Sequence, residues 1–114
     1  MSDPRPQETR RYPRVASENV VLVQSSDPDE AGLFAKTRAL GAGGCSFVAG
    51  EAPAAGTVVD VLLSLGGRIV RARSRVVYVN PSGDRNEVGV EFLELEAEDR
   101  EHLDRYFARR TNGA

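Results

Sequence analysis

Short alternating segments bounded by glycine and proline constrain the fold of this chain more than any other feature of its sequence. Apolar and polar residues alternate with the period of a strand that has one buried face. Gly66-Gly67 is typical of a two-residue hairpin turn, and 27–32 and 80–84 predict wider turns. The strand-like segments are 20–24, 33–40, 45–49, 57–65, 68–79 and 87–95. Six short strands predict a mainly β fold, a small antiparallel β-barrel, because a closed barrel exposes no strand edges.

The same alternation predicts which side chains point into the barrel. In segment 33–40 we expect Leu33, Ala35, Thr37 and Ala39 to share one face. In segment 68–79 three arginines are expected on the outer face, at Arg71, Arg73 and Arg75. The predicted inward set in the last three segments is Val59, Val61, Leu63, Leu65, Val70, Ala72, Val76, Tyr78, Val88, Val90 and Phe92.

One segment has the period of a helix rather than that of a strand. In 97–110, Leu103, Tyr106 and Phe107 recur at spacings of three and four residues, which places them on one stripe. The segment begins with acidic residues and ends with basic ones, as the helix dipole favours. We therefore predict a C-terminal α-helix that packs on the barrel.

Length and composition bound the class of protein. The 114 residues predict one domain, with 1–9 as a flexible N-terminal arm and 10–114 as the barrel domain with its helix. The net charge of −2 gives no support to nucleic-acid binding, and no apolar run is long enough to predict a membrane span or a secretion signal. We expect a cytoplasmic location, which the single cysteine, Cys45, fits.

The residue inventory gives no pattern of an enzyme. His102 is the only histidine, and it lies in the charged helical segment with no nucleophile at motif spacing. One cysteine and one histidine do not make a zinc site without patterned carboxylates. We therefore expect no catalysis, no metal and no cofactor.

Two features point to binding of a phosphate-bearing ligand. Arg10, Arg11 and Arg14 lie close together near the N-terminus, and a glycine-rich turn spans 41–44. Arginine binds phosphate with two parallel hydrogen bonds, and glycine lets the backbone approach a ligand closely. The plain alternatives are a solvated basic tail and an ordinary tight hairpin.

These residues resemble the PilZ domain family of bacteria. The likeness rests on Arg10-Arg11-Tyr12-Pro13-Arg14, on the turn 39–44, and on the ending Val88-Gly89-Val90-Glu91-Phe92 before the helix. It implies a six-stranded barrel ending in a helix, and many members bind cyclic di-GMP. The family motif Arg-x-x-x-Arg matches Arg10 and Arg14. The resemblance then implies a ligand site made of Arg10, Arg11, Arg14, Gly41, Gly43 and Gly44.

The second family motif, Asp/Asn-x-Ser-x-x-Gly, is matched here at its final glycine, Gly44. Ala39 and Gly41 replace the acidic or amide residue and the serine, so the groups that read the guanine base are missing. Losing two polar contacts would weaken affinity by about 30- to 200-fold.

The resemblance leaves two hypotheses about function. One is a cyclic di-GMP receptor or adaptor that passes the signal to a protein partner. The alternative is a degenerate PilZ domain that binds no nucleotide and acts through protein contacts in motility or surface behaviour. A third possibility, nucleic-acid binding on the barrel, lacks an aromatic platform for bases. We interpret the arginine row at 71–75 as a solvated outer face.

Overall fold

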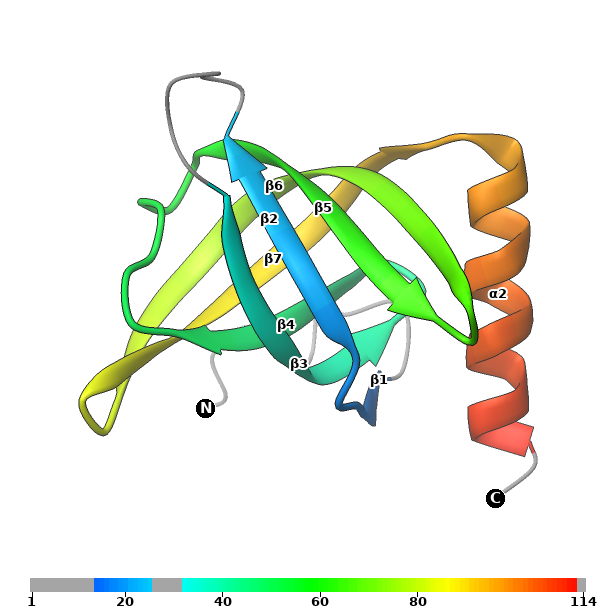
Figure 1. Ribbon diagram of the computed structural model, residues 1–114, viewed down its shortest axis with the longest axis horizontal. Coiled ribbons are helices and arrows are strands. Elements are labelled where there is room, and N and C mark those ends of the chain that lie inside the picture. Colours follow the sequence, from blue (N-terminus) through cyan, green and yellow to red (C-terminus); the bar gives the residue numbers. More distant parts are fainter. Residues whose placement is uncertain (1–13, 26–31, 113–114) are drawn as a thin grey trace, which may run out of the picture.

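In the part of the chain that the structure describes, a closed barrel of antiparallel strands carries one helix at its end (Figure 1). The computed structural model describes residues 14–25 and 32–112, with side chains for 16–25 and 32–109. The described elements are β1 (Arg14–Ala16), β2 (Val20–Ser25), β3 (Leu33–Gly41), β4 (Gly44–Ala49), β5 (Val58–Leu65), β6 (Arg68–Ser82), β7 (Arg85–Leu95) and α2 (Ala97–Asn112). The predicted arm 1–9 and most of the predicted turn 27–32 lie outside the described residues.

Six of these strands form the barrel, and the seventh extends it. The strands pair in the order β1-β3-β2-β5-β6-β7-β4, and a further pairing between β3 and β4 closes the ring. Every pairing is antiparallel. The predicted six-stranded antiparallel barrel with a C-terminal helix is therefore confirmed. The short strand β1, which pairs with the end of β3, was not predicted.

The barrel interior holds the aliphatic side chains that the alternation assigned to it. Val61, Leu63 and Val90 are completely buried. Phe47 of β4 is also at 0% exposure and is the largest fully buried side chain. The Gly66-Gly67 turn has positive φ angles of 59° and 87°, as a two-residue hairpin requires. Burial of one face of each strand therefore fixes the register of the barrel.

Two β-bulges overturn parts of the predicted faces. The register shifts between Thr37 and Ala39, so Leu40 rather than Ala39 is buried inside the barrel. A second shift lies between Val76 and Tyr78. Tyr78 pairs with Gly89, and Gly89 faces outward because its neighbours Val88 and Val90 both point into the core. The shift therefore places Tyr78 on the outer face. A bulge adds one residue to a strand and reverses the alternation beyond it.

The predicted turn at 80–84 is shorter than expected. Strand β6 continues through Pro81 to Ser82, and the chain reverses at Gly83 and Asp84. Pro81 fits in the strand because β5 pairs with β6 only as far as Arg75. Beyond that point one edge of β6 is free of a partner strand, so the missing N–H of proline breaks no ladder bond.

The helix α2 packs against the end of the barrel where β5 turns into β6 (Figure 1). Leu103 is fully buried and Phe107 is 9% exposed, which confirms the predicted stripe. The ring nitrogen Nε2 of His102 lies 2.8 Å from the carbonyl oxygen of Leu65. The Asp99 carboxylate accepts a hydrogen bond of 3.3 Å from the Arg71 backbone N–H. These contacts hold the first three turns of the helix on the sheet.

Candidate ligand-binding site

The strand β1 brings the arginine motif to the glycine hairpin. Arg14 pairs with Gly41 across the β1–β3 ladder, and Gly41 pairs in turn with Gly44 of β4. The hairpin predicted at 41–44 is therefore confirmed as the connection between β3 and β4. Of the predicted arginines, Arg10 and Arg11 lie outside the described residues, and Arg14 is described by its backbone.

A polar network fixes the segment that follows β1. The hydroxyls of Ser17 and Thr37 lie 2.5 Å apart, and the Asn19 backbone N–H donates to Thr37 Oγ1 at 2.9 Å. Asn19 Nδ2 also donates to Ser17 Oγ at 2.6 Å. Thr37 is only 2% exposed, so its hydroxyl is a buried group satisfied within the fold. The network anchors β1, and with it the backbone of Arg14, to β3.

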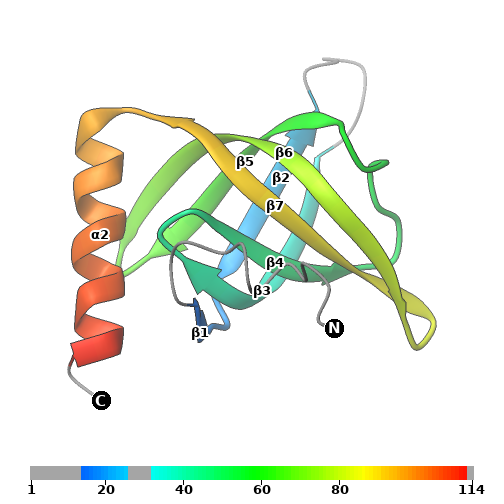
Figure 2. The same ribbon diagram turned by 180° about the vertical axis from the view of Figure 1, so that it is seen from behind.

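Small residues lie on the outward side of the sheet beside β1, and we call this set the glycine shelf. It is defined by Ala39, Gly41, Gly44, Ser46 and Gly89. These residues alternate with fully buried core residues such as Leu40, Cys45 and Val88, so they belong to the outer face. Figure 2 shows this side of the barrel, with β4 between β3 and β7. Ala39 is half-buried, whereas Gly41, Gly44, Ser46 and Gly89 are buried, so the shelf offers small residues close to the backbone rather than an open surface.

Two larger groups border the shelf on the side away from β1. The ladder pairs Gly44 with Glu91 of β7, and Glu91 with Arg75 of β6. In the neighbouring row, Gly89 lies beneath the ring of Tyr78, which fills the space that a side chain there would need. One row across the sheet therefore reads Arg14, Gly41, Gly44, Glu91 and Arg75.

The hairpin is held from two other elements. The Phe92 backbone N–H of β7 donates to the Gly43 carbonyl at 2.9 Å. Arg100 of α2 donates from Nη1 to the Ala42 carbonyl at 2.7 Å. A side chain at Gly44 would collide with the Val90 carbonyl oxygen, so the position requires glycine for space. The hairpin is thus a fixed part of the barrel with a direct bond to the helix.

Charged groups on β3, β6 and β7 pair with one another beside the shelf. Arg75 Nη1 lies 3.1 Å from Glu91 Oε2, and Arg38 Nη1 lies 3.8 Å from Glu87 Oε1. The Tyr78 hydroxyl donates to Glu87 at 3.2 Å. The side chains of Arg75 and Glu91 are 49% and 44% exposed, so this ion pair contributes little to stability and stays open to solvent.

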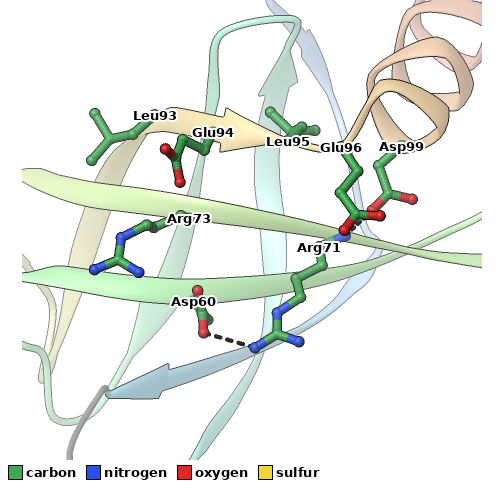
Figure 3. Close-up of a pocket in the computed structure, with 8 residues that line it drawn as sticks. All are labelled: Asp60, Arg71, Arg73, Leu93, Glu94, Leu95, Glu96 and Asp99. Atoms are coloured by element: carbon green, nitrogen blue, oxygen red, sulfur yellow. Dashed lines mark hydrogen bonds and ion pairs between the residues drawn. The ribbon is translucent and has the colours of Figure 1, made fainter.

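The arginine row of β6 lines a shallow groove on the outside of the barrel (Figure 3). Arg71 donates to Asp60 at 3.0 Å, whereas Arg73 has no ion-pair partner among the described residues. The groove residues are Asp60, Arg71, Arg73, Leu93, Glu94, Leu95, Glu96 and Asp99. Because carboxylates outnumber arginines there, the groove presents no concentrated positive charge, and the interpretation as a solvated face fits it.

The lone cysteine and the lone histidine both pack as parts of the fold. Cys45 is fully buried in the core, and His102 contacts the Leu65 carbonyl as described above.

Across 16–25 and 32–109, no cluster of histidine, cysteine and carboxylate side chains could hold a metal ion. In the same part of the chain, no helix is long and apolar enough to cross a membrane. Phe34 is the only mostly exposed aromatic side chain there, at 70%.

Sequence reasoning missed several residues that build this surface. Ser17, Asn19 and Thr37 had no motif to mark them. Gly89 carried a usable signal, because glycine inside a strand often marks a close approach of another group. Glu91 was visible as part of the family-like ending, but its place beside Gly44 depends on the pairing of β4 with β7.

The fold and its surface define a class, the small closed antiparallel barrels that carry a C-terminal helix. A family model for the PilZ domain matches residues 8–109, and the chain belongs to the PilZ domain family. The resemblance stated from the sequence is thereby confirmed. Among curated proteins, none matches the chain by sequence.

Solved structures share the fold. The Bacillus subtilis inhibitor of motility, MotI/DgrA, is similar with a TM-score of 0.78 and 20% identity, over 96% of this chain and 56% of that one. Escherichia coli YcgR in complex with c-di-GMP is similar with a TM-score of 0.75 and 15% identity, over 93% and 47%. The PilZ domain of YcgR with c-di-GMP gives 0.70 and 16%, over 92% and 98%. The chain thus spans about half the length of the first two.

Proposed function

We propose that this protein is a cyclic di-GMP receptor that acts as an adaptor, passing the signal to a protein partner. The proposal makes it a regulatory binding domain of the bacterial cytoplasm rather than an enzyme. Membership of the PilZ family and the solved complexes of YcgR with c-di-GMP support it. In this proposal the nucleotide is a signal, and no cofactor is needed.

One observation carries the proposal: the pairing of Arg14 with Gly41 at the edge of the glycine shelf. An arginine motif near the N-terminus has no fixed relation to a hairpin many residues later unless the fold provides one. The β1–β3 ladder provides it, and the polar network around Thr37 keeps it in place. Cationic donors, and small residues that let the backbone approach a ligand, suit the phosphates and flat bases of a cyclic dinucleotide.

The roles of the residues follow from their chemistry. Arg10 and Arg14 would bind phosphate and guanine, with Arg11 in support. Gly41, Gly43 and Gly44 would form the surface on which the nucleotide lies. Restoring the family's polar groups gives a direct check of this placement. The variant Ala39→Asp/Gly41→Ser should bind cyclic di-GMP about 30- to 200-fold more tightly by calorimetry. An unchanged affinity would place the nucleotide elsewhere.

The adaptor role depends on α2. Arg100 bonds to the hairpin at Ala42, and the Tyr106 hydroxyl donates to Asn19 Oδ1 at 3.2 Å. The helix is therefore tied both to the β3–β4 hairpin and to the segment that anchors β1. A nucleotide that shifts either tie would change the surface that α2 offers to a partner. Motility is the process we propose, because MotI/DgrA is an inhibitor of motility.

Isothermal titration calorimetry with cyclic di-GMP tests the receptor proposal. The wild type should release or absorb heat with a single-site isotherm below high micromolar concentrations. Arg14→Ala should bind at least about tenfold more weakly, because charge-assisted hydrogen bonds are lost. The matched control is Arg85→Ala, an exposed arginine at the start of β7, which should bind like the wild type.

A wild type that gives no heat would contradict the receptor proposal. It would favour the alternative, a PilZ domain that binds no nucleotide and works through protein contacts. The substitutions at Ala39 and Gly41 are the observation behind that alternative. Family membership does not favour it.

A further inference from the structure

The glycine shelf lacks the two side chains that read guanine in the family motif, yet a charged pair borders it. We infer that Glu91 and Arg75 form a guanine-reading pair that takes over base recognition from the positions of Ala39 and Gly41. The inference rests on the proposed function, because it assumes that the shelf binds a guanine nucleotide. It adds a specificity site that the family motif does not contain.

The sheet register places the pair on the same row as the glycines. Gly41 faces Gly44, Gly44 faces Glu91, and Glu91 faces Arg75 in consecutive ladders. Neighbouring strands are spaced about 4.8 Å apart, so Glu91 lies roughly 10 Å from Gly41 along the row. No side chain stands at the position between them, and a larger residue at Gly44 is excluded by the Val90 carbonyl. A flat purine base on the shelf would meet the Glu91–Arg75 pair at its edge.

The chemistry of the pair matches the edge of guanine. Guanine presents two acceptors, N7 and O6, followed by two donors, N1–H and the N2 amino group. Arginine donates to N7 and O6, whereas a carboxylate can only accept and so suits N1–H and N2. Arg75 Nη1 and Glu91 Oε2 lie 3.1 Å apart, which sets donor beside acceptor in this order. Adenine keeps the N7 acceptor but has an amino donor in place of O6 and an acceptor at N1, so it mismatches the pair at these two positions.

The other charged residues near the shelf already have partners or lie on another part of the barrel. Glu87 accepts a hydrogen bond from Tyr78 and lies 3.8 Å from Arg38, so it has two partners already. Asp60 and Arg71 form a similar cross-strand pair, but they lie on β5 and β6 and line the groove of Figure 3. Among the described carboxylates, Glu91 is the one paired in register with a glycine of the hairpin. The competing explanation is an ordinary surface ion pair.

Titrations of four proteins with cyclic di-GMP and with cyclic di-AMP test the inference. The proteins are the wild type, Glu91→Gln, Arg75→Gln and the matched control Asp60→Asn, which alters an equivalent exposed pair away from the shelf. Glu91→Gln and Arg75→Gln should each bind cyclic di-GMP at least about tenfold more weakly, since hydrogen bonds to charged groups are lost. Their preference over cyclic di-AMP should also fall. Asp60→Asn should match the wild type in both titrations.

The double variant Arg75→Glu/Glu91→Arg separates recognition from structure. It keeps an ion pair at the border but exchanges donor and acceptor. Its thermal midpoint should stay near that of the wild type while its cyclic di-GMP affinity remains low. Recovery of full affinity in the double variant, or unchanged affinity in Glu91→Gln, would overturn the inference and leave the receptor proposal standing. Absence of binding by the wild type would instead overturn the receptor proposal itself.

Discussion

Gly44 is the residue of the shelf whose identity the backbone dictates. A β-carbon there would overlap the Val90 carbonyl oxygen, which belongs to the β7 backbone and has little freedom to move. Gly44→Ala should therefore destabilise the fold by about 1–3 kcal/mol, as overpacking of a tight site does. Urea unfolding measures this. Gly50→Ala is the control, because nothing lies within 4 Å of a β-carbon at Gly50. Equal stabilities would contradict the packing described here.

Thr37 is a buried hydroxyl on which the attachment of β1 depends. It contacts the Ser17 hydroxyl and accepts from the Asn19 backbone N–H. Thr37→Val removes the acceptor and leaves the half-buried Asn19 N–H without this partner, which should cost about 1–3 kcal/mol. Thr37→Ser keeps the hydroxyl and should lose less. Chemical denaturation of both variants gives the comparison, and a larger loss for Thr37→Ser would contradict the role of the hydroxyl.

At the scale of elements, Arg100 links the helix to the hairpin. Its bond to the Ala42 carbonyl connects α2 to the turn between β3 and β4, and Asp104 lies 3.3 Å from the same nitrogen. We expect cyclic di-GMP to change amide hydrogen exchange in α2 of the wild type. Arg100→Ala should lose most of that change while still binding the nucleotide. The measurement is hydrogen exchange by mass spectrometry, with and without nucleotide.

Arg105→Ala provides the control for this coupling. Arg105 lies on the same helix, and its ion pair is with Glu101 of that helix, at 3.7 Å. Its removal should leave the nucleotide-dependent exchange of α2 as in the wild type. If Arg100→Ala behaves like Arg105→Ala, the helix receives no signal through Ala42.

The elements show which parts of the fold the sequence can predict. Strand β5 and helix α2 followed from their periods, because β5 buries every second residue and α2 buries Leu103 and Phe107 on one stripe. The faces of Leu40 and Tyr78 did not follow, because a bulge changes the alternation without any change in composition. Strand β1 was missed because three residues are too few to show a period.

The candidate site also has one part that the sequence could predict and another that it could not. The hairpin could be located from its glycines, which mark a turn wherever they cluster. The pairing of Arg14 with Gly41 and of Glu91 with Gly44 could not be predicted, since it arises from closure of the barrel. Closure joins strands that are distant in the sequence, and residues on one row therefore carry no common local pattern.

At the scale of the whole molecule, the shelf lies across the seam that closes the barrel. The β3–β4 hairpin and the β4–β7 ladder complete the ring, and the shelf residues belong to these strands. A ligand bound there should stabilise the entire domain, because binding to the folded state alone shifts the unfolding equilibrium. At 100 times its dissociation constant, cyclic di-GMP should add about 2.7 kcal/mol to the free energy of unfolding.

Thermal unfolding monitored by circular dichroism measures this stabilisation. The midpoint should rise with nucleotide concentration in the wild type and rise far less in Arg14→Ala. An equal rise in both proteins would remove Arg14 from the site. Cyclic di-AMP serves as the control ligand and should raise the midpoint less.

The most direct test of the account is to locate the bound nucleotide by NMR. Titration of ¹⁵N-labelled protein with cyclic di-GMP should shift the amide signals of Arg14, Gly41, Gly43 and Gly44 most strongly, followed by Glu91. Signals of the groove at Arg71 and Arg73 should move little. Largest shifts at that groove, with the hairpin glycines unchanged, would contradict the central claim that the glycine shelf beside β1 is the nucleotide site.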